Sequence, residues 1–224
     1  MTALIKLLKV RCLCSLTILQ INEIGQQGLV TPYMGLALVP LTNILSSYSS
    51  NEKQHETLWT SVVDLIQTSL TEDEGGKYAL LHISLANDCC TGFWREEKLR
   101  KLVPTLIAQV EICPSLSAGD TKQALRACLG AMVSVMDDDS SLKKLNLELL
   151  MQTRSDDPQT RLFALQCSEH LWDRHGDKLV GFVSDVATFI AECAEDEHDE
   201  VAKAARALRR TIEKRCGSLD ALMQ

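Results

Sequence analysis

Apolar residues recur at spacings of three and four along most of the chain, which is the pattern of helices with one buried face. Between Leu142 and Gly217 this pattern predicts two consecutive helical hairpins. The first turns at 154–158, and the same order of helix, acidic turn and helix recurs about 41 residues later, with its turn at 196–199. A repeat of this length and content is typical of HEAT or armadillo units, which run to roughly 40–47 residues.

The stripes of the two hairpins correspond position by position. The first consists of Leu142, Leu145, Leu149, Thr160, Phe163, Ala164, Cys167 and Leu171. The second consists of Val183, Val186, Ile190, Val201, Ala204, Ala205, Leu208 and Ile212. The stops also align, with Arg174-His175-Gly176 matching Arg215-Cys216-Gly217, so we expect both returning helices to end at glycine.

Six further helices are expected upstream, which makes about ten in all. They cover 2–23, 31–45, 58–70, 78–89, 94–113 and 125–136. Pro104 lies well inside the fifth of them and predicts a kink or a break, and the acidic, glycine-rich stretch 71–76 predicts a loop. Asp137–Asp139 is expected to cap the helix that carries Leu142.

These helices are expected to form one continuous solenoid. Residues 1–92 would supply less regular hairpins and residues 93–224 the C-terminal HEAT repeats. An apolar helix close to Met1 would leave an open solenoid end, which suggests a fragment of a longer chain.

Composition supports an all-α fold. The chain is 46% hydrophobic but only 4% aromatic, and it lacks Asn-Gly or Asp-Gly hairpin signals. A net charge of −7 argues against general electrostatic binding of nucleic acid.

The nine cysteines predict buried thiols in a reducing compartment, although the vicinal pair Cys89-Cys90 could sense oxidants if it were exposed. No apolar run reaches the roughly 20 residues of a membrane span, so we expect a soluble intracellular protein.

No motif for catalysis, a metal or a cofactor is found in the sequence. His170 and His175 are five residues apart, which is not the spacing that places two ligands on one helical face, and a surface or capping role is expected for them. The acidic cluster 192–200 lacks the spacing of a calcium loop. It favours a negatively charged helix start, or a surface for a basic partner.

Two sets of residues are candidates for recognition or assembly. Arg206, Arg210 and Lys214 form an i, i+4 row that could follow RNA phosphates or could be a solvated face. Trp94 could anchor a partner or pack in the core. Arg154, Asp157 and Arg161 surround the first turn and are expected to form a ladder that ties adjacent repeats together.

The C-terminal segments resemble a known family. Asp137-Asp138-Asp139-Ser140-Ser141-Leu142 leads into Leu149–Arg154 and Arg161–Leu165. Phe189-Ile190-Ala191-Glu192 then precedes Glu195–Val201. Together with Phe93-Trp94, these segments resemble the extreme C-terminus of the large HEAT-repeat, U-three small-nucleolar-RNA-associated subunit of the small-subunit processome, over about residues 93–224.

The resemblance implies a non-enzymatic nucleolar scaffold in early pre-ribosomal RNA transcription and processing. Its implied partners are other processome proteins, including β-propeller subunits, with pre-ribosomal or small nucleolar RNA bound directly or indirectly. Two alternatives stay open at this point. One is a HEAT-type transport or phosphatase adaptor that holds protein cargo, and the other is direct RNA recognition by the last helix.

Overall fold

The computed structural model describes residues 31–47, 56–74, 93–116 and 120–220. Every regular element within these ranges is helical, which confirms the predicted all-α class. The helices expected over 2–23 and 78–89, and the cysteines Cys12, Cys14, Cys89 and Cys90, lie outside the described residues.

The described helices form successive antiparallel pairs. The first two pairs are α3 (Thr31–Ser47) with α4 (Glu56–Glu74) and α6 (Glu96–Ile112) with α7 (Thr121–Val135). The next two are α8 (Asp139–Met151) with α9 (Pro158–Leu179) and α10 (Val183–Ala194) with α11 (Asp199–Cys216). Short 3-10 turns follow three of the helices: η2 (Cys113–Ser115), η3 (Gln152–Arg154) and η4 (Val180–Phe182).

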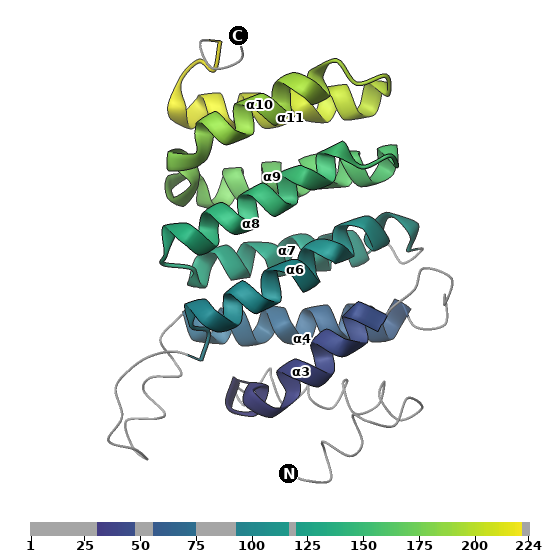
Figure 1. Ribbon diagram of the computed structural model, residues 1–224, viewed down its shortest axis with the longest axis vertical. Coiled ribbons are helices and arrows are strands. Elements are labelled where there is room, and N and C mark those ends of the chain that lie inside the picture. Colours follow the sequence, from purple (N-terminus) through teal and green to yellow (C-terminus); the bar gives the residue numbers. More distant parts are fainter. Residues whose placement is uncertain (1–30, 48–55, 75–92, 117–119, 221–224) are drawn as a thin grey trace.

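The pairs stack along one axis into a two-layer α-solenoid (Figure 1). Helices α3, α6, α8 and α10 form one layer, and α4, α7, α9 and α11 form the layer behind it. One cluster of buried apolar residues runs between the layers from Met34 in α3 to Leu219 beyond α11. Each pair therefore buries its apolar stripes against its neighbours, as repeat proteins do.

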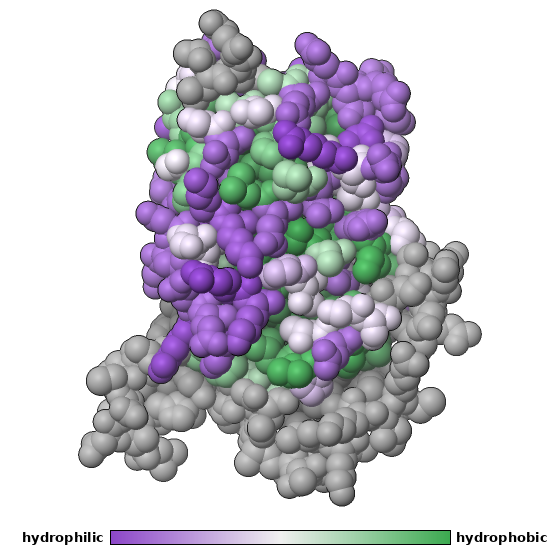
Figure 2. Space-filling view, in the orientation of Figure 1, coloured by the Kyte–Doolittle hydropathy of each residue, from purple (hydrophilic) through white to green (hydrophobic). Residues whose placement is uncertain are grey.

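The hydrophobic pattern accounts for this core. Of the stripe residues of the two last hairpins, all are buried except Val183 and Ala204, which are partly buried. On the face formed by α3, α6, α8 and α10, the hydrophobic areas of the described surface are divided by hydrophilic ones (Figure 2). Among the described helices, none combines the length and the apolar character that a membrane span requires.

Of the kink or break predicted at Pro104, the break is wrong, because α6 continues through this residue to Ile112, and the kink stays a prediction. Proline has no N–H, so the carbonyl group of Arg100 lacks its usual donor one turn later. The side chain of Lys144 in α8 replaces it, with Nζ 3.3 Å from the Arg100 oxygen. A neighbouring repeat thus satisfies the backbone group that the proline leaves free.

Two predicted ends also lie elsewhere. Helix α4 extends to Glu74, so the predicted loop does not begin at Thr71. Helix α9 does not stop at Gly176: it kinks at His175, whose φ and ψ are −126° and 22°, and continues to Leu179. Arg215 lies against Gly176 so closely that a Cβ there would clash with its side chain. Gly217 does end α11, and its φ of 82° is a conformation that favours glycine.

Candidate functional site

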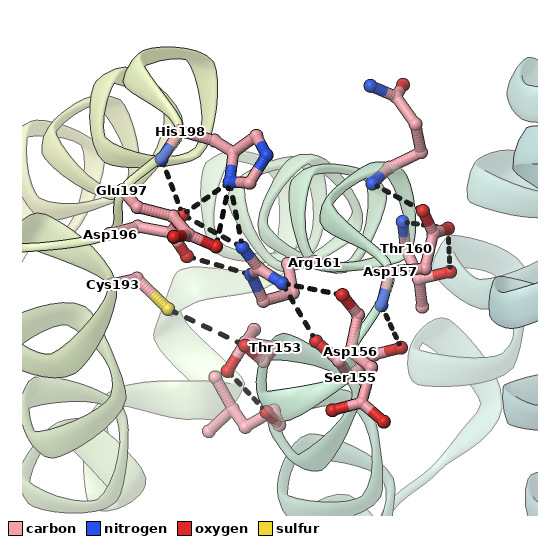
Figure 3. A network of polar contacts seen from close by, with 12 residues as sticks. Thr153, Ser155, Asp156, Asp157, Thr160, Arg161, Cys193, Asp196, Glu197 and His198 are labelled. Atoms are coloured by element: carbon pink, nitrogen blue, oxygen red, sulfur yellow. Dashed lines mark hydrogen bonds and ion pairs between the residues drawn. The ribbon is translucent and has the colours of Figure 1, made fainter.

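The turn between α8 and α9 lies against the turn between α10 and α11, and Arg161 joins them (Figure 3). Its Nε and Nη2 donate to the two carboxylate oxygens of Asp196 at 2.8 and 2.9 Å. Its Nη1 donates to the carbonyl oxygens of Ser155 and Asp156 at 3.0 and 3.1 Å. The two paired side chains are only 12% and 10% exposed. Arg161 therefore fixes its own turn and the next repeat together.

Arg154 forms a second link, closer to the solvent. Its Nε and Nη2 donate to both carboxylate oxygens of Glu192 at 2.8 and 2.6 Å. The guanidinium also lies over the ring of Phe189, 4.4 Å from its centre. Because the Arg154 and Glu192 side chains are 46% and 44% exposed, solvent weakens this pair more than the Arg161 pair.

Asp157 acts within its own repeat. It is the N-cap of α9, and its carboxylate accepts hydrogen bonds from the N–H groups of Gln159 and Thr160 at 3.2 and 3.0 Å. The hydroxyl group of Thr160 adds a third, at 2.8 Å. Of the three residues predicted to form a ladder, Arg154 and Arg161 reach the next repeat and Asp157 does not.

The two ion pairs of the ladder, Arg161 with Asp196 and Arg154 with Glu192, change the acidity of their carboxylates. The hydrogen bonds from Arg161 hold the pKa of the Asp196 carboxyl below its usual value, and those from Arg154 do the same for Glu192. Burial raises the pKa of the Cys193 thiol, which contacts the carbonyl oxygen of Thr153. The carboxylates are thus held charged beside their arginines while the neighbouring thiol stays protonated.

Basic side chains also bind backbone carbonyl groups across repeats, which the sequence did not reveal. Lys178 donates to the carbonyl oxygens of Val133, Ser134 and Met136, at the end of α7. Arg215 donates to the carbonyl oxygen of Asp173 at 2.6 Å, near the kink of α9. The contacts of Lys178 satisfy carbonyl groups that the end of α7 leaves without donors, whereas Arg215 binds a carbonyl group inside α9.

Another link crosses three helices through one amide. Gln109 in α6 accepts a 2.8 Å hydrogen bond from the indole nitrogen of Trp59 in α4. Its amide nitrogen lies 3.4 Å from the carbonyl oxygen of Leu45 in α3. A polar residue inside an apolar stripe was the only sequence signal for this contact.

Trp94 packs in the core rather than on the surface. It is 5% exposed, and its indole nitrogen donates to the hydroxyl oxygen of Ser69 at 3.0 Å. It therefore offers almost no surface to a partner in this structure, in line with the packing alternative.

The basic row of α11, which we define as Arg206, Arg210 and Lys214, is exposed on the side opposite the buried stripe. Within the described part of the chain, none of the three forms an ion pair or a hydrogen bond. Their neighbours Arg209 and Arg215 are instead paired, with Glu213 and Asp177. The charge of the basic row is thus available to another molecule.

The acidic residues of the cluster at 192–200 lie in two different environments. Glu192 and Asp196 of the acidic cluster belong to the ladder, whereas Asp199 and Glu200 occupy the first turn of α11, where negative charge favours a helix.

The described residues contain no group of three or more potential metal ligands. His170 and His175 do not project separately into solvent, because both imidazoles approach Gly130 in α7.

Comparison with known proteins gives a family and several relatives. Residues 95–221 match the family of stalled ribosome sensor GCN1-like HEAT repeats. U3 small nucleolar RNA-associated protein 10 of Schizosaccharomyces pombe is 26% identical over 197 residues, which are 88% of this chain and 10% of that protein. The protein of the same name from Neosartorya fischeri is 24% identical over 205 residues, covering 85% of this chain and 11% of that protein.

A third relative, HEAT repeat-containing protein 1 homolog of Drosophila melanogaster, is 30% identical over 118 residues, or 53% of this chain and 6% of that protein. The chain thus spans about a tenth or less of the curated relatives it matches. No solved structure matches it. These similarities confirm the resemblance seen in the sequence, and a match over 88% of the chain extends it upstream of residue 93.

Proposed function

This chain belongs to the family of GCN1-like HEAT repeats, and we propose that it acts as a non-enzymatic scaffold segment in the nucleolar small-subunit processome. The observation that carries this proposal is the similarity to U3 small nucleolar RNA-associated protein 10 over 85–88% of the chain. Association with this RNA, which the relatives' name states, would place the chain in early pre-ribosomal RNA transcription and processing.

The geometry suits such a role. Stacked repeats present extended surfaces, and they bind along these surfaces rather than in a single deep pocket. Mixed hydrophobic and hydrophilic areas on one layer fit contacts spread over several neighbours (Figure 2). The ladder and the cross-repeat caps hold successive repeats in one register, so partners that bind different repeats would keep a fixed separation.

We expect the full-length protein, tagged in cells, to concentrate in the nucleolus. Affinity purification should recover U3 small nucleolar RNA together with other processome proteins, β-propeller subunits among them. A nucleoplasmic, nuclear-rim or cytosolic signal without nucleolar enrichment would contradict the proposal. Such a result would favour the HEAT-type adaptor instead.

A direct RNA contact by the basic row of α11 is a second, narrower proposal. Residues four apart on a helix are separated by about 6 Å along its axis, so the three cations form an even line of charge. Their lack of partners among the described residues favours it, because only an available cation can neutralise a phosphate and release its counterion.

Changing Arg206, Arg210 and Lys214 together to Ala is expected to weaken RNA binding at low salt. If all three neutralise phosphates of a single strand, the slope of log affinity against log salt concentration should fall by about 2. The measurement is a fluorescence-anisotropy titration at several salt concentrations. The control changes Arg100, Lys101 and Lys143 to Ala, which removes the same charge from the other layer. Equal losses in both variants, or no loss in the first, would rule out a specific role for the row.

A further inference from the structure

A cleft of about 500 Å³ opens where α4, α7 and α9 meet. Gln67 and Thr71 of α4 line one side, Gly130 of α7 lies between, and His170, Arg174 and His175 of α9 line the other side. Its volume falls within the range of small-ligand sites. The described residues that line the cleft carry amide, hydroxyl, imidazole and guanidinium groups. None of these residues carries a carboxylate.

The two imidazoles converge on Gly130, which has no side chain to fill the space between them. A Cβ on Gly130 would lie 3.5 Å from Nε2 of His170 and 3.7 Å from Nε2 of His175. One small ligand atom near this point could therefore meet both rings. The kink of α9 at His175 accounts for the convergence, because residues five apart on a straight helix point in different directions. Nε2 of His170 is buried and has no hydrogen-bond partner in the described structure.

Two arginines at or near the cleft have no partner among the described residues. Neither Arg174 nor the nearby Arg126 forms an ion pair or hydrogen bond within the described ranges. By contrast, Arg154, Arg161 and Arg215 each hold a carboxylate. Burial lowers the pKa of His170, and the positive charges of Arg174, Arg126 and His175 lower it further, against an upward effect of Asp173. An anion in the cleft would relieve this repulsion.

From the cleft, the converging imidazoles and the unpaired Arg174, we propose that this is a binding site for a phosphate group. Arg174 supplies the charge and a planar fork of donors, and the imidazoles contact the phosphate beside Gly130. A guanidinium group in the wall disfavours a metal cation at the same place. The phosphate comes either from a small phosphate ion or from an RNA backbone, and the proposal stands independently of a role in the nucleolus.

The test uses the 224-residue chain with labelled histidines, observed by NMR at constant ionic strength. Inorganic phosphate should shift the imidazole signals of His170 and His175 until they saturate. Arg174→Gln should weaken this binding about tenfold, as expected for the loss of a charge-assisted hydrogen bond. Lys143→Gln, a matched loss of one exposed charge on the other layer, should leave it unchanged.

The Gly130→Ala variant distinguishes a loss of phosphate binding from a loss of folded protein. Its methyl group would occupy the point shared by the two Nε2 atoms, and alanine favours a helix over glycine. We expect weaker phosphate binding by a protein that melts no lower than the parent. Phosphate shifts that persist undiminished in both Arg174→Gln and Gly130→Ala, or that never saturate, overturn the proposal.

A short single-stranded oligouridylate distinguishes the two sources. If it produces the same imidazole shifts, competes with inorganic phosphate and depends on Arg174, the RNA backbone is the source. If only inorganic phosphate does so, the source is a small phosphate. If neither ligand shifts these signals, the cleft is not a phosphate site.

Discussion

Arg161→Ala is expected to lower the free energy of unfolding by about 3 kcal/mol, the loss typical of breaking a buried ion pair. The change removes both hydrogen bonds to Asp196 and leaves this carboxylate almost buried without its partner. It also removes the donors to the carbonyl oxygens of Ser155 and Asp156. Urea unfolding followed by circular dichroism measures the loss.

The matched control is Arg154→Ala, because Arg154 also forms a two-pronged pair with a carboxylate of the next repeat. That pair is nearly half exposed, so its loss should cost no more than about 1 kcal/mol. Hydrogen exchange should show the Arg161 variant opening first in α10 and α11, since each repeat contacts only its neighbours. Equal costs for the two substitutions would contradict the role assigned to burial.

The contribution of Asp196 should depend on pH in a defined direction. Its pKa is lowered in the folded protein, chiefly by the hydrogen bonds from Arg161. Its stabilising contribution is therefore complete above the ordinary carboxyl pKa of about 3.9, and is lost as the pH falls through the lowered value. The difference in stability between the parent and Arg161→Ala should thus narrow below about pH 4. A constant difference down to strong acid would show that Asp196 is not the partner that matters.

The stripes and turns of the last two hairpins could be predicted because they depend on local periodicity. Apolar residues at three- and four-residue spacings determine which face is buried, and Asp138 and Asp157 cap helices as their positions before the stripes suggest. The prediction that Arg154 and Arg161 tie adjacent repeats together also had a physical basis. A repeat of about 41 residues brings successive turns together, so basic residues in one can meet acidic residues in the next.

Features that depend on a neighbouring repeat could not be predicted in the same way. Pro104 should interrupt a lone helix, but Lys144 from the next repeat satisfies the carbonyl group that it leaves free. Likewise, the spacing of His170 and His175 argues against a shared site only for a straight helix. The local pattern predicted a helix end at Gly176. It did not indicate that α9 would kink at His175, continue to Leu179 and direct one ring toward Gly130.

Trp172→Ala is expected to be among the most destabilising single changes, at about 4 kcal/mol, because the side chain is completely buried in α9. Trp172→Phe should cost far less. The indole nitrogen of Trp172 has no hydrogen-bond partner in the described structure, so phenylalanine removes an unsatisfied donor while keeping most of the apolar volume. Thermal and urea unfolding of both variants measures the two effects.

Trp59→Phe provides the matched comparison, because Trp59 is just as buried but its indole nitrogen donates to Gln109 at 2.8 Å. The same substitution there leaves a buried amide oxygen without its donor, which costs about 1–3 kcal/mol more than at Trp172. The two tryptophans thus separate the energy of filling space from the energy of a hydrogen bond between helices. If the two Phe variants lose the same free energy of unfolding, the hydrogen bond from Trp59 to Gln109 does not stabilise the contact between repeats. Apolar packing alone would then set the register of the repeats.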